Sequence, residues 1–328
     1  PEPWGIRIVP ADCWIDPARP VELALVTHGH SDHARGGHKN VLATAETIGI
    51  MKRRYGEDCA QHFQALPYNE PLQIGPVRVT LYPAGHILGS AQVLLEHKDC
   101  RIVVSGDYKR GPDPISSPFE PVKCDIFVTE ATFGLPVFQH PDSKDEIQKL
   151  LASVRHFPDR THVIAAYALG KTQRVIALLR EAGYDAPIYL HGSMCGCCDF
   201  YMENGIRLGD LRKATGLAKD ELKGQIVIAP PSAVKEPWAR RMNDPVIAMA
   251  SGWMTVKQRV RQRGIELPLV ISDHADWTEL KDTIRETEAG EIWVTHGREE
   301  ALVHWCQSIG LKAAPLHLQG REDEEGED

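Results

Sequence analysis

The stretch THGHSDH, residues 27–33, places three histidines and an aspartate within six positions. Imidazole nitrogens and carboxylate oxygens are ordinary zinc ligands, so this spacing favours metal chemistry. His30, Asp32 and His33 lie too close together in sequence for one cation to use all three easily, and they suit two neighbouring cations. The stretch follows the apolar run Leu23–Thr27, whose strand end would hold the turn rigidly. The alternative is a solvated polar loop that binds no metal.

Further histidines and acids come directly after other apolar, strand-like runs. A lone histidine in such a place is more often structural. Five such residues together with the histidine turn predict strand ends that meet at one edge of a sheet sandwich. The turn would then be half of a binuclear site. The five residues are His86, Asp107, Glu130, His274 and His296.

The first 135 residues read as a β-rich layer with short crossovers, because apolar runs alternate with turn-rich segments. Two more strands, Leu269–Ser272 and Ile292–Thr295, resume this layer near the end of the chain. The expected strands of the first part are Leu23–Thr27, Val77–Tyr82, Ala91–Leu95, Arg101–Ser105 and Ile126–Thr129.

The pattern changes after residue 135 to helices that alternate with strands, which predicts an α/β unit with a parallel sheet. Ser143 and Glu146 form a capping-box pattern at the start of an amphipathic helix. A second helix is expected near Lys171–Glu181, ending at Gly183. The expected strands are His162–Ala166, Ile188–Leu190, Ile226–Ala229 and Val246–Ala250.

Composition excludes several classes of protein. With 42% hydrophobic and 25% charged residues, the 328-residue chain is globular and long enough for two domains. No apolar run approaches the roughly 20 residues of a membrane span, and the N-terminus carries no signal pattern, so we expect a cytoplasmic protein without a membrane partner. The tail Glu322–Asp328 holds six acids, and removing it would bring the net charge from −8 to −2. Overall charge therefore does not indicate nucleic-acid binding.

The eight cysteines do not form the framework of a small secreted protein. Cys195, Cys197 and Cys198 cluster in MCGCC, which could be a metal or redox group. They lack the paired spacing of a zinc ribbon, so a structural role is favoured.

The ordered motifs resemble the metallo-β-lactamase superfamily: H-x-H-x-D-H, then Gly-His, then Gly-Asp. Within it, EATFG, ALGKTQ, SDHADW and VTHG resemble the β-CASP nucleases, over about residues 16–300. DYKRGPDP and TEATFGLPVF are most similar to the bacterial ligase-associated DNA exonucleases. This implies an α/β fold, an αββα sandwich with an inserted β-CASP domain. Residues 1–135 and 269–320 would form the core, 136–268 the insertion, and 321–328 an acidic tail.

The resemblance implies a role for each candidate residue. His28, His30 and His86 would hold one divalent cation, Asp32, His33 and His296 a second, and Asp107 would bridge them. His274 matches the proposed general acid, and Glu130 the acid that supports a neighbouring histidine. Asp16 matches an early structural aspartate, with Asp12 as its competitor. Asp273 stands where related RNases usually carry a small residue. Zinc is the default metal, and manganese tolerates the same ligands.

Two divalent cations would lower the pKa of a water between them, so that it can attack phosphorus in line, and His274 would protonate the leaving oxygen. Glu130 or Asp276 could orient a histidine through its far nitrogen. Ser251 and Gly252 could form a phosphate-binding turn, with a plain tight turn as the alternative.

Other basic and aromatic residues carry two interpretations each. Lys109 and Arg110 could steer phosphate. The basic run Lys257–Arg263 could contact a nucleic-acid backbone, but a solvated helix face explains it as well. Trp253 and Trp277 could stack a base, although core packing is favoured for each.

We therefore predict a metal-dependent DNA exonuclease that acts on single-stranded DNA in repair or end processing, with a DNA ligase and a helicase as functional partners. The alternatives are an RNA-processing nuclease of the RNase J or cleavage-factor type, a small-molecule metallohydrolase and an inactive scaffold. The inserted domain argues against the small hydrolase, and the complete ligand set argues against the scaffold.

Overall fold

The computed structural model describes residues 2, 4–235, 237–240, 242 and 244–317, which divide into two units. Unit 1 comprises residues 1–138 and 274–328, and unit 2 comprises residues 139–273. The boundaries therefore fall three and five residues later than the expected insertion, 136–268. The acidic tail, 321–328, lies outside the described residues. In the described ranges, no helix is both long enough and apolar enough to cross a membrane.

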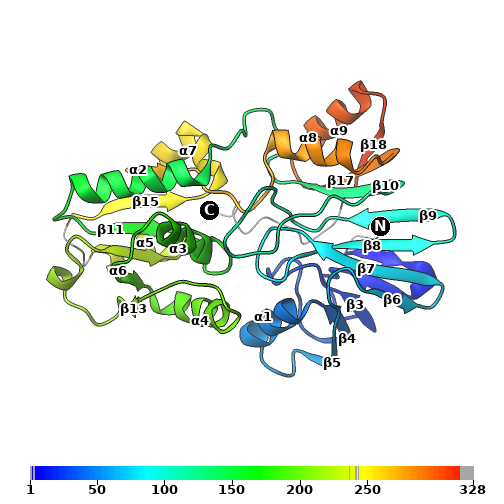
Figure 1. Cartoon of the computed structure of the whole chain (residues 1–328), viewed down its shortest axis with the longest axis horizontal. Coiled ribbons are helices and arrows are strands. Elements are labelled where there is room, and N and C mark those ends of the chain that lie inside the picture. The colour runs from blue at the N-terminus through cyan, green and yellow to red at the C-terminus, as the bar shows by residue number, and fades with distance from the viewer. Residues whose placement is uncertain (1, 3, 236, 241, 243, 318–328) are drawn as a thin grey trace. The chain divides into compact units, whose positions relative to one another are not determined.

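Unit 1 contains two sheets (Figure 1). The five-stranded sheet is parallel except for its β1–β2 pair. Its strands are β1 (Ile6–Ile8), β2 (Cys13–Ile15), β3 (Leu23–Leu25), β4 (His38–Ala43) and β5 (Ala60–Ala65), in that order. The seven-stranded sheet has the order β18-β17-β10-β9-β8-β7-β6. These strands are β6 (Pro71–Ile74), β7 (Val77–Pro83), β8 (Ala91–His97), β9 (Cys100–Val104), β10 (Ile126–Ala131), β17 (Glu291–Gly297) and β18 (Lys312–Pro315).

The two sheets pack face to face through an apolar layer. Alternate residues point to one face of a strand, so Val77, Val79 and Leu81 of β7 all enter this layer. They share it with Leu25 and Leu42 from the five-stranded sheet. Burying these side chains between the sheets is what holds the two together.

Helices cover the outer faces of both sheets. Helix α1 (Ala45–Tyr55) packs Ile48 and Met51 against the five-stranded sheet. Helices α8 (Trp277–Glu286) and α9 (Glu299–Ser308) place Leu280 and Leu302 in a cluster with Phe127 of the seven-stranded sheet. The resulting order of helix, sheet, sheet and helix confirms the predicted αββα sandwich.

Unit 2 contains a six-stranded sheet in which every pair is parallel, as predicted. Its order is β13-β12-β14-β11-β15-β16. The strands are β11 (His162–Ala165), β12 (Ile188–Leu190), β13 (Leu211–Lys213), β14 (Ile226–Ala229), β15 (Val246–Ala250) and β16 (Leu267–Leu269). The helices are α2 (Ser143–His156), α3 (Lys171–Glu181), α4 (Cys195–Glu203), α5 (Pro231–Lys235), α6 (Pro237–Arg240) and α7 (Lys257–Gln262) (Figure 1).

Two details of unit 2 differ from the sequence expectations. Asp142, not Ser143, caps α2, because its side chain accepts the Lys144 N–H. Glu146 is buried and accepts the Val270 N–H at 2.8 Å, so it does not complete a capping box. The strand expected at Leu269–Ser272 was also wrong. The strand ends at Leu269, pairs with β15, and belongs to the sheet of unit 2.

The cysteine cluster lies at the start of α4. Burial raises the pKa of the Cys198 thiol to about 12, and Gln173 Nε2 donates to its sulfur at 3.3 Å. Burial also raises the pKa of Cys195. No metal-capable group found among the described residues contains a cysteine. These observations favour the structural interpretation of MCGCC.

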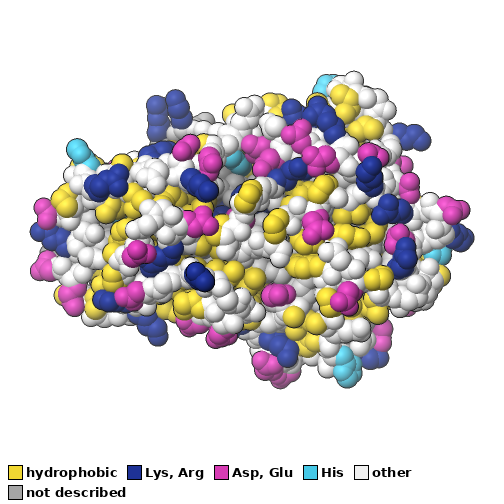
Figure 2. Space-filling model, viewed as in Figure 1, with side chains coloured by type: hydrophobic (Ala, Val, Ile, Leu, Met, Phe, Trp, Pro, Cys, Tyr) yellow, Lys and Arg dark blue, Asp and Glu magenta, His cyan; other side chains and the backbone are white. Residues whose placement is uncertain are grey.

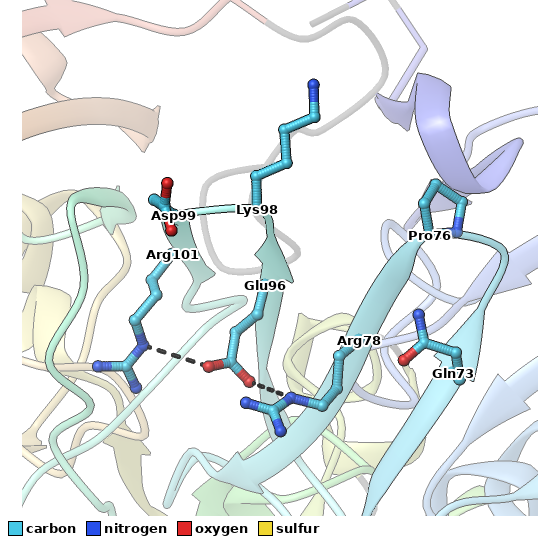
Figure 3. A pocket seen from close by; sticks show the side chains of 7 residues that line it. All are labelled: Gln73, Pro76, Arg78, Glu96, Lys98, Asp99 and Arg101. Atoms are coloured by element: carbon cyan, nitrogen blue, oxygen red, sulfur yellow. Dashed lines mark hydrogen bonds and ion pairs between the residues drawn. The ribbon is translucent and has the colours of Figure 1, made fainter.

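Charged side chains of both signs are interspersed over the face of the molecule shown in Figure 2. A surface pocket of about 410 Å³ lies at the β8–β9 turn (Figure 3). Arg78 and Arg101 in this pocket both pair with Glu96. The pocket is at the opposite end of β7 and β9 from His86 and Asp107. Its lining residues are Gln73, Pro76, Arg78, Glu96, Lys98, Asp99 and Arg101.

Candidate metal centre

The histidine turn begins three residues after the end of β3. Two backbone bonds close it: the His33 and Ala34 N–H groups both donate to the His30 carbonyl, at 3.1 and 2.7 Å. This tight turn brings His28, Asp32 and His33 inward, and all three are buried. The solvated-loop alternative is therefore wrong.

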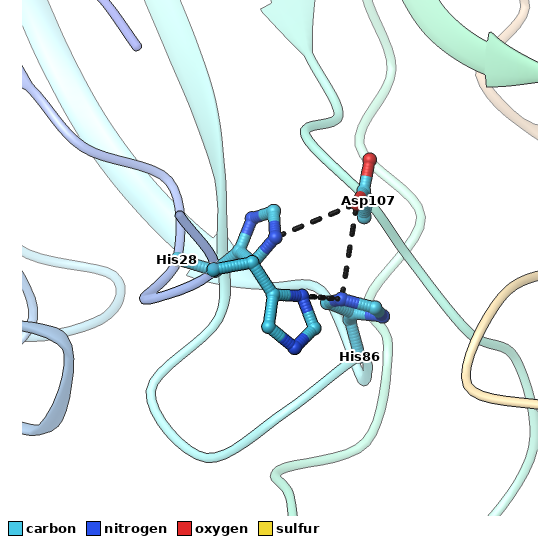
Figure 4. A group of neighbouring side chains, drawn as sticks. His28, His86 and Asp107 are labelled. Atoms are coloured by element: carbon cyan, nitrogen blue, oxygen red, sulfur yellow. Dashed lines mark hydrogen bonds and ion pairs between the residues drawn. The ribbon is translucent and has the colours of Figure 1, made fainter. Parts of the chain in front are cut away.

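The first group of side chains comprises His28, His30, His86 and Asp107, whose ligand atoms all lie within 4.8 Å of one another. His28 Nε2 is 3.4 Å and His86 Nε2 is 3.8 Å from the same oxygen, Asp107 Oδ2 (Figure 4). His30 Nδ1 is 3.0 Å from His86 Nε2. These are the residues expected to hold the first cation together with the bridging aspartate.

The second group comprises Asp32, His33, Asp107 and His296 within the same limit of 4.8 Å. His33 Nε2 lies 3.4 Å from Asp32 Oδ2 and 3.5 Å from Asp107 Oδ1. His296 Nε2 lies 3.3 Å from Asp32 Oδ2. Asp107 therefore turns one carboxylate oxygen toward each group, as a bridging ligand would.

The chemistry of these side chains fits two divalent cations. His28 Nε2, His33 Nε2 and Asp107 Oδ1 are buried, yet they have no hydrogen-bond partner in the described part of the chain. Buried polar atoms nearly always have one, so clustered orphan atoms on three imidazole or carboxylate groups indicate ligands. Zinc and manganese both accept such mixed nitrogen and oxygen ligands.

Electrostatics prepare several groups for ligation. Burial lowers the pKa of His28, and the neighbouring imidazoles lower it further, so its ring is neutral. Burial would raise the pKa of Asp107, but His33 and the other facing histidines hold it well below its usual range. Burial would lower the pKa of His33, but Asp107, Asp32 and Asp16 raise it. Metal binding at His33 therefore has to displace a proton.

Hydrogen bonds behind the ligands set which ring nitrogen faces the centre. Asp16 Oδ2 lies 2.7 Å from His33 Nδ1, and this leaves Nε2 on the ligand side. Asp16 also accepts the Thr27 N–H at 2.8 Å and the Thr27 hydroxyl at 2.6 Å. The same hydroxyl oxygen is 3.1 Å from His28 Nδ1, so it can accept that N–H. The competitor, Asp12, is exposed and pairs with Arg7 instead.

Thr27 was missed as a functional residue in the sequence. It joins Asp16 to His28, so it orients a ligand without being one. A threonine at a strand end, directly before the first histidine, was the available signal.

His274 and Glu130 form a third group with Asp107. His274 Nδ1 is 3.0 Å from both oxygens of the Glu130 carboxylate. Glu130 is itself fixed, because it accepts the Tyr108 N–H at 2.8 Å. This places a proton on Nδ1 of His274, and a transferable second proton would be carried on Nε2. Of the two carboxylates expected to orient a histidine, Glu130 makes the contact.

His296 sits on an unusual backbone. Its φ angle is +65°, and Gly297 follows with a φ of +79°. A Cβ at position 297 would collide with the Ala131 carbonyl oxygen on the neighbouring strand. Glycine is therefore required there for the end of β17 to turn His296 toward Asp32.

Comparisons with known proteins support the same assignment. No family model matches the chain. A protein called "Probable DNA ligase" from Opitutus terrae is 28% identical over 317 residues, which is 94% of this chain and 30% of that protein. "Endoribonuclease ysh-1" from Neurospora crassa is 32% identical over 145 residues, or 41% of this chain and 17% of that protein. These relatives point to the β-CASP branch of the metallo-β-lactamase superfamily.

A solved structure has a similar fold. "Crystal Structure of a Protein of Unknown Function from Enterococcus faecalis V583" superposes with a TM-score of 0.62 at 15% identity, covering 93% of this chain and 80% of that one. This chain spans less than a third of the length of the two relatives described above.

Asp276, expected to orient a histidine, and Arg110, expected to steer phosphate, both make structural contacts. Asp276 Oδ1 accepts the N–H groups of Thr278 and Glu279, so Asp276 caps α8. Arg110 makes a two-pronged ion pair with Glu286 at 2.8 and 2.9 Å. This pair holds the Arg110 guanidinium in place, and the steering role expected for Arg110 stays a prediction.

The expected phosphate contacts are placed as follows. Lys109 is half-buried, and its Nζ donates to the Arg110 carbonyl at 3.0 Å. Ser251 and Gly252 are buried in a turn that the Ser251 hydroxyl closes by accepting the Trp253 N–H. This is the geometry of the tight-turn alternative, and contact with phosphate stays a prediction for all three residues.

The basic run forms the short helix α7. Arg259 lies over the Trp253 ring, 4.0 Å from its centroid, and Lys257 and Arg261 are exposed. Trp253 and Trp277 are both buried, which supports core packing over base stacking. The exposed Lys257 and Arg261 fit a solvated helix face, and contact of this run with a nucleic-acid backbone stays a prediction.

Proposed function

We propose that the chain is a binuclear-metal phosphodiesterase that degrades single-stranded DNA from an end. The observation that carries this is Asp107, which shares its two oxygens between two histidine-rich groups while also lying beside the His274–Glu130 pair. Metal ligands and a supported histidine within one buried cluster are what hydrolysis of a phosphodiester requires.

The chain's own residues provide orientation and a proton. When bound, two divalent cations would supply Lewis acidity, for activating water and for neutralising charge on the phosphate oxygens. His28, His30, His86, Asp32, His33, His296 and Asp107 would hold them. Asp16 and Thr27 keep His33 and His28 in the ligating orientation. The low-pKa carboxylate of Asp107 stays ionised.

His274 would complete the reaction as the general acid. A water that has lost one proton to solvent would bond through its oxygen to phosphorus, the bond from phosphorus to O3′ would break, and O3′ would take a proton from His274 Nε2, which solvent then restores. The products are a 5′-phosphate and a 3′-hydroxyl. Glu130 stabilises the protonated ring through Nδ1, which keeps the donating nitrogen directed away from Glu130.

DNA as the substrate is supported by the relative called "Probable DNA ligase", which matches 94% of this chain. A region like this chain within a protein of that name favours a role in DNA repair or end processing, alongside a ligase and a helicase. We place this activity in the cytoplasm and take zinc as the metal. The metallohydrolase and scaffold alternatives fit the nuclease-named relatives less well.

RNA processing is the second candidate, and a specific observation favours it. "Endoribonuclease ysh-1" is 32% identical to part of this chain, and "RNase J-like protein" from Methanocaldococcus jannaschii also matches it. The two candidates share the metal centre, so the centre alone does not separate them.

Digestion of end-labelled oligonucleotides separates the two candidates. Single-stranded DNA and RNA of one sequence, labelled at the 5′ or the 3′ end, are incubated with the protein and added zinc or manganese. We expect stepwise shortening of DNA from one end while RNA is spared. Internal cuts in RNA with DNA intact would move the protein to RNA processing, and no cleavage of either would contradict the nuclease proposal.

A further inference from the structure

Lys171 is a fully buried lysine at the first position of α3, outside the metal centre. The N-terminal end of a helix carries partial positive charge, so an ammonium there is unfavourable unless it is paired. Its Nζ donates to the Asp273 carboxylate at 2.5 Å and to the Ile271 carbonyl at 3.0 Å. Arg174, also buried, lies 3.7 Å from the other oxygen of Asp273.

These partners belong to the segment 270–273, which connects β16 to His274. The segment is not part of a strand, and side chains of unit 2 anchor it instead. Glu146 accepts the Val270 N–H at 2.8 Å, and Lys171 donates hydrogen bonds to Ile271 and Asp273. Lys171 therefore fixes the side chain of the residue directly before His274 and the backbone carbonyl two residues earlier.

The chain after His274 is anchored separately, within unit 1. The Ala275 N–H donates to the Tyr108 carbonyl at 2.7 Å. His274 itself bonds Glu130 through Nδ1 at 3.0 Å. Backbone position on one side of the histidine thus depends on Tyr108, and on the other side it depends on Lys171.

We propose that Lys171 is a positioning residue for His274. Its hydrogen bonds to the Ile271 carbonyl and the Asp273 carboxylate hold the backbone that directs His274, the general acid, toward the leaving oxygen. This inference rests on the proposed function. Asp273, directly before His274 in the chain, is the acceptor for the Lys171 ammonium. Loss of the Lys171 hydrogen bonds should therefore impair proton donation by His274 and leave metal binding intact.

The test is the Lys171→Met variant, assayed on two DNA substrates that differ in one atom. The first is an ordinary single strand. The second carries sulfur in place of the 3′-bridging oxygen at the scissile linkage, and a thiolate leaves without needing a proton. We expect kcat on the ordinary strand to fall about tenfold to hundredfold, since a misaimed catalytic group costs about that much. On the sulfur-containing strand kcat should fall less than about threefold, with KM unchanged on both.

Matched variants separate positioning from general damage. His274→Ala should show the same selective loss, and larger. Lys223→Met removes an exposed lysine that pairs with Asp159, and it should behave as wild type. Val163→Ala destabilises the core of unit 2 without touching segment 270–273, and it should not discriminate between the substrates. If Lys171→Met does not fold, Asp273→Asn weakens the same contact and should give the same pattern more weakly.

The outcomes are distinguishable. If kcat of Lys171→Met or Asp273→Asn falls equally on both substrates, or on neither, the positioning role is overturned. The proposed nuclease function would stand in that case, because the wild-type protein cleaves DNA. Loss of bound metal in the same variants, measured by elemental mass spectrometry, would overturn the positioning role as well. A wild-type protein that cleaves neither strand would overturn the proposed function on which the inference rests.

Discussion

Asp16 and His33 form a fully buried pair in which the carboxylate Oδ2 lies 2.7 Å from the imidazole Nδ1. The contact determines which nitrogen of His33 faces the metal centre, although Asp16 is not itself a ligand. A carboxylate that hydrogen-bonds a metal-binding histidine in this way commonly raises the affinity for the metal, because it fixes the orientation of the ring and makes it more basic.

Replacing Asp16 by Asn should therefore weaken cation binding at the second group about 10- to 100-fold. The amide removes the charge that orients His33 and supports its basicity. Isothermal titration with zinc measures the two affinities. Asp12→Asn is the matched control, since Asp12 is an exposed partner of Arg7 and its loss should change neither affinity. Equal zinc affinities in wild type and Asp16→Asn would show that the pair is only structural.

Replacing Asp107 by Ala should remove metal from both groups, because its two oxygens face different sets of histidines. Elemental mass spectrometry of the purified protein would then find less than one cation per chain. His86→Ala is the comparison, since His86 belongs to the first group alone and its loss should spare the second cation. Two retained cations in Asp107→Ala would contradict the bridging role.

Replacing Gly297 by Ala should disturb the second group without altering any ligand. The added Cβ meets the Ala131 carbonyl, and the backbone at this residue has a φ of +79°. Such strain costs about 1–3 kcal/mol, and relief of it would move His296. Thermal unfolding and zinc titration should both show the loss. Gly290→Ala serves as control, because a Cβ there has nothing within 4 Å. Unchanged stability and zinc affinity in Gly297→Ala would refute the steric requirement.

Unit 2 should lose stability on mild acidification because of His162. Burial lowers the pKa of this histidine below its ordinary value. The unfolded chain therefore takes up a proton more readily, so stability is complete above the ordinary pKa of about 6.5 and declines as the pH falls below it, by up to about 1.4 kcal/mol per pH unit.

Urea unfolding between pH 7.5 and 5.5, followed by hydrogen exchange at β11, measures this decline. His162→Gln should flatten it, whereas His156→Gln, at an exposed position on α2, should not. A decline of the same slope in His162→Gln would assign the effect to other groups.

The regular elements with strong local patterns could be predicted from the sequence. Helix Lys171–Glu181 and the strands Ile188–Leu190, Ile226–Ala229 and Val246–Ala250 have the expected bounds. Strands buried on both faces read as continuous apolar runs, and a glycine ends the helix, so neighbouring residues suffice to define them.

Other features depended on contacts that no local pattern contains. The apolar run at Leu269–Ser272 resembles a strand, but Glu146 and Lys171 take the backbone groups that a ladder would use. Asp276 lies beside His274 in sequence, yet it caps α8, and Glu130, more than a hundred residues away, is the residue that supports the histidine. The metal-ligand candidates could be predicted because each comes at or shortly after the end of an apolar run in the sequence. The residues that orient these ligands, such as Asp16 and Thr27, could be identified only from their hydrogen bonds in the structure.

The central claim is that phosphodiester hydrolysis depends on two cations held by groups that share Asp107. It is tested most directly by stripping the protein with a chelator, adding zinc or manganese in steps, and following bound metal and cleavage of single-stranded DNA together. We expect cleavage to stay near background while one cation is bound and to rise as the second binds. Full cleavage by the stripped protein, or full cleavage with only one cation bound, would contradict a binuclear centre.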